Sequence, residues 1–66
     1  MTKDDAKQAM LEGKKETHDY FSPNEWATMQ GNEVVLEDGV HCSEDEFWKY
    51  RSAKYFEYGW SIYGAE

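Results

Sequence analysis

Aromatic and basic side chains that could hold a nucleotide gather in the last third of the chain. Trp48 and Arg51 are spaced i, i+3 in a predicted helix, so they share one face of it. A tryptophan ring can stack on a base, and a guanidinium can bind a phosphate through two hydrogen bonds. The spacing therefore predicts a stacking platform beside a phosphate clamp, with Phe47 and Tyr50 facing the core. The alternative is that Trp48 packs inward and that Arg51 pairs with a surface acid.

Further candidates for the ligand-binding set lie outside this helix. His18 and Tyr20 share one face of a predicted strand, where a neutral imidazole could donate to a phosphate or a ribose. The alternative for His18 is an ordinary solvated strand residue. Trp26, beyond the turn at Pro23, is expected either to cap a pocket or to cover a hairpin. The predicted ligand-binding residues are His18, Tyr20, Trp26, Trp48, Arg51 and Trp60.

Catalytic and metal-binding patterns are weak in this sequence. The acids at the two predicted helix starts are explained by helix capping and by the helix dipole. Cys42 next to His41 does not make a nucleophile–base pair, because neighbouring strand side chains point to opposite faces. Together with His18 and Asp38 they match no ligand spacing of a known metal site. We therefore predict a protein that is not an enzyme and that has no cofactor.

Length and cysteine content limit the class of protein. The chain of 66 residues is predicted to form one domain, residues 1–66. A chain of this size buries only about 60% of its unfolded surface, so it needs additional stabilisation. The single Cys42 excludes an internal disulfide, so we expect the additional stabilisation to come from assembly into a homo-oligomer. The lone thiol and the absence of a signal peptide predict a cytoplasmic setting, and no apolar run approaches the roughly 20 residues that span a bilayer.

The charge balance excludes one class of partner and suggests another. The formal net charge is −7, from fourteen acids and seven bases. This balance argues against direct contact with nucleic acid, which favours clustered lysine and arginine. An acidic face could instead imitate DNA and occupy a DNA-binding protein, or it could simply keep a small protein soluble.

The hydrophobic pattern predicts a small α+β domain. Its antiparallel sheet has three to four strands, with an N-terminal helix and a second short helix before the last strand. The helices are expected at residues 2–12 and 44–51, and the strands at residues 14–21, 25–30, 33–36 and 60–63.

Local signals support these boundaries. Ser43 and Glu46 form the pattern of a capping box, which predicts a helix start. Thr2 is the expected N-cap of the first helix, and Gly13 follows its end. The Gly31-Asn32 pair between two apolar runs predicts a tight hairpin with a turn of the primed type. A second turn is expected at Asp38-Gly39, ahead of the Ser43 cap.

Several short motifs follow one another along the chain. They are A-x-x-A-M-x-x-G-K-K at residues 6–15, Tyr20-Phe21, Phe47-Trp48 and G-W-S-I-Y at residues 59–63. In this order they resemble a large group of short bacteriophage accessory proteins. They also resemble, more loosely, the Thoeris anti-defence 2-like domain carried by phages. Members of that domain family bind cyclic ADP-ribose-type signals of a host immune system and hold them away from their effector without chemistry.

The resemblance and the aromatic–basic segment together give the expected function. It is a phage anti-defence binding protein that sequesters a small nucleotide second messenger, of ADP-ribose type or cyclic, in the host cytoplasm. Pockets at the subunit interfaces of a homo-oligomer would supply the concavity that a small chain lacks. The alternative is an acidic inhibitor that imitates DNA and blocks a host nucleic-acid-binding defence protein.

Overall fold

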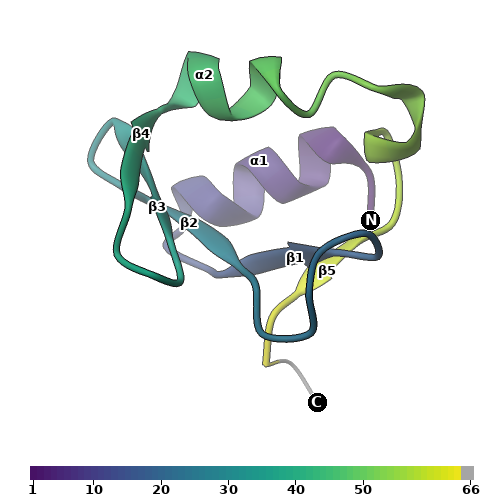
Figure 1. Ribbon diagram of the computed structural model, residues 1–66, viewed down its shortest axis with the longest axis horizontal. Coiled ribbons are helices and arrows are strands. Elements are labelled where there is room, and N and C mark those ends of the chain that lie inside the picture. Colours follow the sequence, from purple (N-terminus) through teal and green to yellow (C-terminus); the bar gives the residue numbers. More distant parts are fainter. Residues whose placement is uncertain (65–66) are drawn as a thin grey trace.

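The chain folds into an antiparallel sheet of five strands with two α-helices on one face, as a computed structural model of residues 1–64 shows (Figure 1). The strand order is β4-β3-β2-β1-β5. The elements are α1 (Lys3–Leu11), β1 (Glu16–His18), β2 (Ala27–Gln30), β3 (Glu33–Leu36), β4 (His41–Ser43), α2 (Glu44–Lys49), the 3₁₀-helix η1 (Lys54–Phe56) and β5 (Trp60–Ile62). The α+β class is confirmed.

The predicted count of three to four strands is wrong, because His41–Ser43 forms a further strand, β4, beside β3. Ser43 pairs with Glu33 and is also the N-cap of α2, with φ −69° and ψ 153°. An N-cap residue takes extended dihedral angles, so the strand can run directly into the helix without a connecting loop.

The first strand is shorter than predicted and ends at His18. The N–H of Phe21 donates to the carbonyl oxygen of His18, and the N–H of Tyr20 donates to the Nδ1 of the same residue. These bonds turn the chain away from the sheet. Helix α2 likewise ends at Lys49, so Arg51 lies beyond it.

Side-chain caps fix both helix starts. At α1 the Asp5 N–H donates to Thr2 Oγ1 and the Thr2 N–H donates to Asp5 Oδ2, each at 3.1 Å, which is a complete capping box. At α2 the Glu46 N–H donates to Ser43 Oγ at 3.1 Å. The return bond from the Ser43 N–H to Glu46 is absent among residues 1–64, so only half of the predicted capping box forms.

The predicted hairpin is confirmed, with Gln30 opposite Glu33 across the turn. Gly31 has φ 63°, whereas Asn32 is not in the positive-φ region. This combination fits a type II′ turn, in which the first central residue alone needs positive φ.

One core joins the helices to the sheet. Helix α1 contacts β2, β5 and β1, and α2 contacts β4 and β3 (Figure 1). Ala6 is fully buried, and its small side chain lets α1 approach the strands closely. The core residues are Ala6, Met10, Ala27, Val34, Phe47, Phe56 and Trp60.

The pairing within the sheet is uneven. Strand β2 pairs with β3 over four residues, whereas β1 and β2 share the single pair Glu16–Ala27. Strand β1 pairs with β5 over its whole length, from Glu16–Ile62 to His18–Trp60. Within residues 1–64 there is no helix with the length and apolarity needed to cross a membrane.

Candidate functional site

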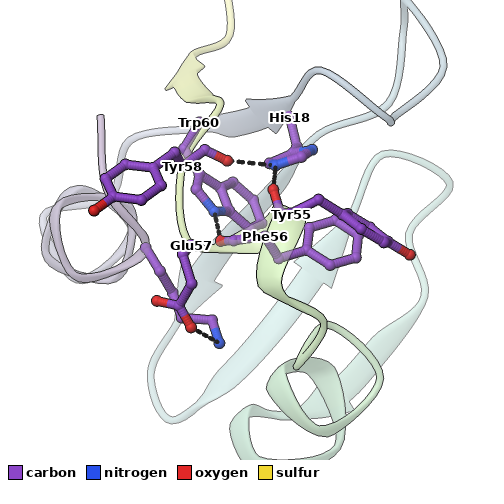
Figure 2. Close-up of polar contacts among 7 residues, drawn as sticks. His18, Tyr55, Phe56, Glu57, Tyr58 and Trp60 are labelled. Carbon is purple, nitrogen blue, oxygen red and sulfur yellow. Dashed lines mark hydrogen bonds and ion pairs between the residues drawn. The ribbon is translucent and has the colours of Figure 1, made fainter.

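The imidazole of His18 lies at the centre of the aromatic part of the fold and is only 4% exposed. Its Nε2 lies 3.0 Å from the carbonyl oxygen of Tyr55 and 2.7 Å from that of Tyr58 (Figure 2). Its Nδ1 accepts the backbone N–H of Tyr20 at 3.0 Å. Because Nδ1 accepts a hydrogen bond, the proton of the neutral ring resides on Nε2, which can then serve the two carbonyls.

The side chains of these three tyrosines are exposed, although their backbone groups are bound to a buried ring. The exposed fractions are 69% for Tyr20, 55% for Tyr55 and 70% for Tyr58. The Tyr55 and Tyr58 side chains leave this centre on opposite sides (Figure 2). His18 therefore fixes the backbone from which exposed tyrosines project in different directions.

Tyr20 and Tyr55 contact each other on the surface. Their ring centroids are 4.7 Å apart with an interplanar angle of 80°, which is an edge-to-face arrangement. Such pairs are favoured by about 0.5–1.5 kcal/mol beyond the area that they bury. We call Tyr20 and Tyr55 the tyrosine pair. The turn after β1, which contains Tyr20, and the 3₁₀-helix containing Tyr55 meet here through His18.

Trp60 lies within the core. Its Nε1–H donates to the carbonyl oxygen of Phe56 at 2.6 Å (Figure 2), and its side chain is 2% exposed. Its ring is 4.9 Å from that of His18 and 5.3 Å from that of Trp48. Trp60 thus joins β5 to the aromatic cluster and presents no free polar atom to a ligand.

Trp48 and Arg51 do not form the predicted platform and clamp. Trp48 is half-buried, and the ammonium groups of Lys7 and Lys3 lie 5.1 and 5.8 Å from its ring centroid. Arg51 instead lies over the ring of Phe47, 4.0 Å from its centroid. The i, i+3 argument fails because the helix ends before Arg51.

Of the two residues predicted to face the core, Phe47 and Tyr50, only Phe47 does so. Phe47 is 1% exposed and belongs to the core, whereas Tyr50, the C-cap residue of α2, is 75% exposed. The helical periodicity that predicted a shared face is lost at the helix end, so Tyr50 points to solvent.

Arg51 carries a half-buried charge with incomplete partners. Its Nη1 donates to the carbonyl oxygen of Phe47 at 3.1 Å, while its Nε is buried without a hydrogen-bond partner. Burial lowers the pKa of the guanidinium, and the charge of Glu25 partly opposes this effect. Within residues 1–64 no carboxylate lies within 4 Å of Arg51. The ring of Phe21 borders it at 5.5 Å.

Residues 47–56 form the most positive segment of this acidic protein. They contain three basic residues and no acid. None of these bases takes part in an ion pair with residues 1–64. We call residues 47–56 the basic aromatic segment; its bases are Lys49, Arg51 and Lys54, and its exposed aromatic residues are Tyr50 and Tyr55.

Trp26 lies apart from the other predicted ligand residues. Its ring is 6.3 Å from that of Tyr63, and the Lys15 ammonium lies 4.3 Å from its centroid. Five of the six candidates are therefore brought to one region by direct contacts or through Phe21 and Phe47, and Trp26 is not.

The residues considered for metal binding are not grouped. Within residues 1–64 there is no cluster of three or more histidine, cysteine or acidic side chains that could hold a metal ion. His41 Nδ1 lies 3.5 Å from Glu33 Oε1 on the sheet edge. Burial raises the pKa of the Cys42 thiol, which favours its neutral form.

Sequence reasoning missed Lys54 and Tyr55 as candidates. The available signal was the absence of acids from residues 47–56, together with aromatic residues between the bases. Their closeness to Tyr20 depends on the return of residues 54–58 to His18, which no sequence pattern reveals.

Residues 1–64 enclose no pocket, so a ligand of a single chain would be held on its surface. Comparisons of the chain with protein family models, with curated proteins and with solved structures found no match.

Proposed function

We propose that this protein is a non-catalytic binding protein, encoded by a phage, that sequesters a nucleotide immune signal in the host cytoplasm. One observation carries the proposal: the basic aromatic segment offers cations that form no ion pair with residues 1–64, beside exposed tyrosines, in a protein of net charge −7. Cations match phosphates and aromatic rings match bases, so this combination suits a nucleotide. The resemblance to phage sponge domains gives independent support.

A homo-oligomer is part of this proposal. Because residues 1–64 enclose no pocket, a nucleotide on the surface of one chain would stay partly exposed to solvent, and a second copy would cover it. Pockets between subunits are a common solution for small chains. Light scattering with and without nucleotide measures this part of the proposal directly.

A thermal-shift screen with ADP-ribose derivatives and cyclic di- and trinucleotides tests the proposed function. A ligand at 100 times its Kd that binds only the native state adds about 2.7 kcal/mol of stability. For a domain of this size that gain raises Tm by more than about 4 °C. A folded protein that shows no shift with any of these compounds contradicts the proposal.

A second candidate function is favoured by a different part of the surface. Residues 33–46 contain six acids and no lysine or arginine. Most of these acids are exposed, on β3, in the turn between β3 and β4, and at the start of α2. Such a surface suits an inhibitor that imitates DNA and occupies a basic, nucleic-acid-binding host protein.

Variants in which amides replace acidic side chains distinguish the two candidate functions. Replacing Glu44, Asp45 and Glu46 by their amides removes part of the acidic surface and leaves the basic aromatic segment unchanged. An inhibitor is expected to lose its ability to displace DNA from a basic protein, whereas a nucleotide sponge keeps its thermal shift. The DNA-displacement assay uses a fluorescent duplex and one purified host nucleoid protein.

A further inference from the structure

The tyrosine pair adjoins the basic aromatic segment. Lys54 directly precedes Tyr55 at the start of η1, and both side chains are exposed. Tyr58, which has the same backbone contact with His18, directly follows Glu57 instead. The charge of the preceding residue therefore differs in sign for these two exposed tyrosines, whose backbone carbonyls both contact His18.

His18 makes the tyrosine pair a rigid surface. It binds the backbone N–H of Tyr20 through Nδ1 and the carbonyl oxygen of Tyr55 through Nε2. Both ring nitrogens are engaged, and the ring packs against Phe56 with 4.6 Å between centroids. An exposed aromatic surface whose backbone is already ordered loses less conformational entropy when it binds a ligand.

The half-buried charge of Arg51 is a second, independent observation that points to an anion. Its guanidinium lies against Phe21, the residue that follows Tyr20. No carboxylate of residues 1–64 lies within 4 Å of it, and only the more distant charge of Glu25 acts on it. A half-buried cation without a direct ion pair gains more from an added anion than a solvated one does, because water screens it less.

We infer that a nucleotide docks on the tyrosine pair, with its base against Tyr20 and Tyr55 and its phosphates toward Lys54 and Arg51. The inference rests on the proposed function and names its site. His18 is a positioning residue in this site, because both of its ring nitrogens form hydrogen bonds with the backbone of the tyrosines. Tyr55 thus takes the stacking role that the sequence alone would give to Trp48, and Lys54 takes the phosphate-binding role suggested for His18.

Titration calorimetry with ADP-ribose, in buffer of low ionic strength, tests this site. Tyr55→Ala is compared with Tyr58→Ala, which removes another exposed tyrosine whose backbone carbonyl contacts the same imidazole. Lys54→Gln is compared with Lys14→Gln, which removes an exposed lysine outside the basic aromatic segment. Because Tyr55→Ala removes an aromatic ring on which the base would stack, it is expected to weaken binding by about tenfold. The Tyr58 and Lys14 variants are expected to bind within about twofold of the wild type.

Each result either supports or overturns the inference. Equal losses in Tyr55→Ala and Tyr58→Ala overturn it, as does binding that none of the four variants changes. In the second case a thermal shift with ADP-ribose still supports the proposed function, with the site elsewhere. If ADP-ribose does not bind the folded wild type, this inference is overturned, whereas the proposed function is overturned only if the cyclic di- and trinucleotides of the thermal-shift screen do not bind either. Adenosine that binds as tightly as ADP-ribose contradicts the role of Lys54 and Arg51.

The positioning role of His18 has its own test. His18→Gln retains a donor and an acceptor, whereas His18→Leu retains neither. Both variants lose the aromatic packing, so their stabilities are measured and binding is compared at a temperature where each is folded. We expect His18→Gln to keep measurable binding and His18→Leu to lose it. Equal binding by the two folded variants excludes a positioning role.

Discussion

At the scale of single residues, Glu16 is the most unusual group in the protein. It lies on β1 with no exposed surface, and neither carboxylate oxygen has a hydrogen-bond partner within residues 1–64. Burial raises its pKa to about 7, while the N-terminal ammonium and Lys14 oppose the rise. A buried carboxyl without partners is more stable in its neutral form, because ionisation would place an unsolvated charge in the core.

This pKa makes the stability of the fold depend on pH. Below about pH 4.5 the carboxyl is protonated in both states, so its ionisation costs nothing. Between pH 4.5 and about 7 the unfolded chain ionises and the folded protein does not, so stability falls as pH rises. Above this window the full loss is about 3 kcal/mol, at 1.36 kcal/mol for each pH unit. Glu16→Gln is expected to abolish this fall in urea denaturation series at pH 5 and pH 8, whereas Glu37→Gln, in an exposed turn, keeps it.

Gly59 is the residue where backbone conformation and close packing coincide. Its φ is 88°, and a methyl group there would lie 2.9 Å from Asp19 Oδ2 and 3.1 Å from His18 Nε2. Gly13 has nearly the same φ, 87°, with no atom within 4 Å. Gly13→Ala is therefore expected to cost about 1–2 kcal/mol for the left-handed conformation alone. Gly59→Ala is expected to cost more, because the methyl group also displaces Asp19 or His18. Equal losses for both variants in chemical denaturation would contradict the close contact.

At the scale of the elements, the capping box of α1 is a testable source of stability. Thr2→Ala removes the acceptor for the Asp5 N–H at the start of a helix that packs on three strands. The expected loss is about 1 kcal/mol, the usual effect of removing a threonine cap. Ser52→Ala, at an exposed position outside any helix, serves as the control. A loss no larger than that of the control would show that the cap is dispensable.

The elements also show what the sequence can and cannot predict. Turns with a strong local signal, such as Gly31-Asn32, and both helix caps are placed correctly, because their chemistry is local. Strand β4 is missed because Ser43 serves as strand end and helix cap at once, and a cap signal alone does not reveal pairing with Glu33.

The candidate site is harder to predict than the fold. The sequence identifies His18 and the aromatic end of the chain, but the role of His18 depends on carbonyls of residues 55 and 58. Such contacts join segments far apart in the chain, and single-sequence periodicity carries no information about them. The misplacement of Arg51 has a local cause instead, since a helix boundary shifted by two residues changes the face on which a side chain lies.

At the scale of the whole molecule, the net charge of −7 works against compactness. Within residues 1–64 only Glu12 and Glu57 lie within salt-bridge distance of a lysine. Raising the salt concentration from about 10 mM to 0.3 M screens the repulsion among the remaining acids, since the Debye length falls below about 10 Å. Tm is therefore expected to rise with sodium chloride in a thermal melt. A smaller rise is expected after Glu44, Asp45 and Glu46 are changed to amides, and a fall in Tm with salt would contradict net repulsion.

Because β1 and β2 share a single residue pair, we predict that the sheet opens as two cooperative units, one of β2, β3 and β4 and the other of β1 and β5. The strands β2, β3 and β4 follow one another through short turns, so they can form early, whereas β1 and β5 join distant segments and form late. In native-state hydrogen exchange, the amides of β1 and β5 are expected to open together, at a lower free energy than those of β3. His18, Tyr20 and Tyr55 belong to the unit of β1 and β5, and the acidic residues 33–46 belong to the unit of β2, β3 and β4. Opening of β1 and β5 would therefore disrupt the tyrosine pair, the proposed nucleotide site, and leave the acidic residues 33–46 folded. A ligand on the tyrosine pair is expected to slow hydrogen exchange in β1 and β5 and not in β3.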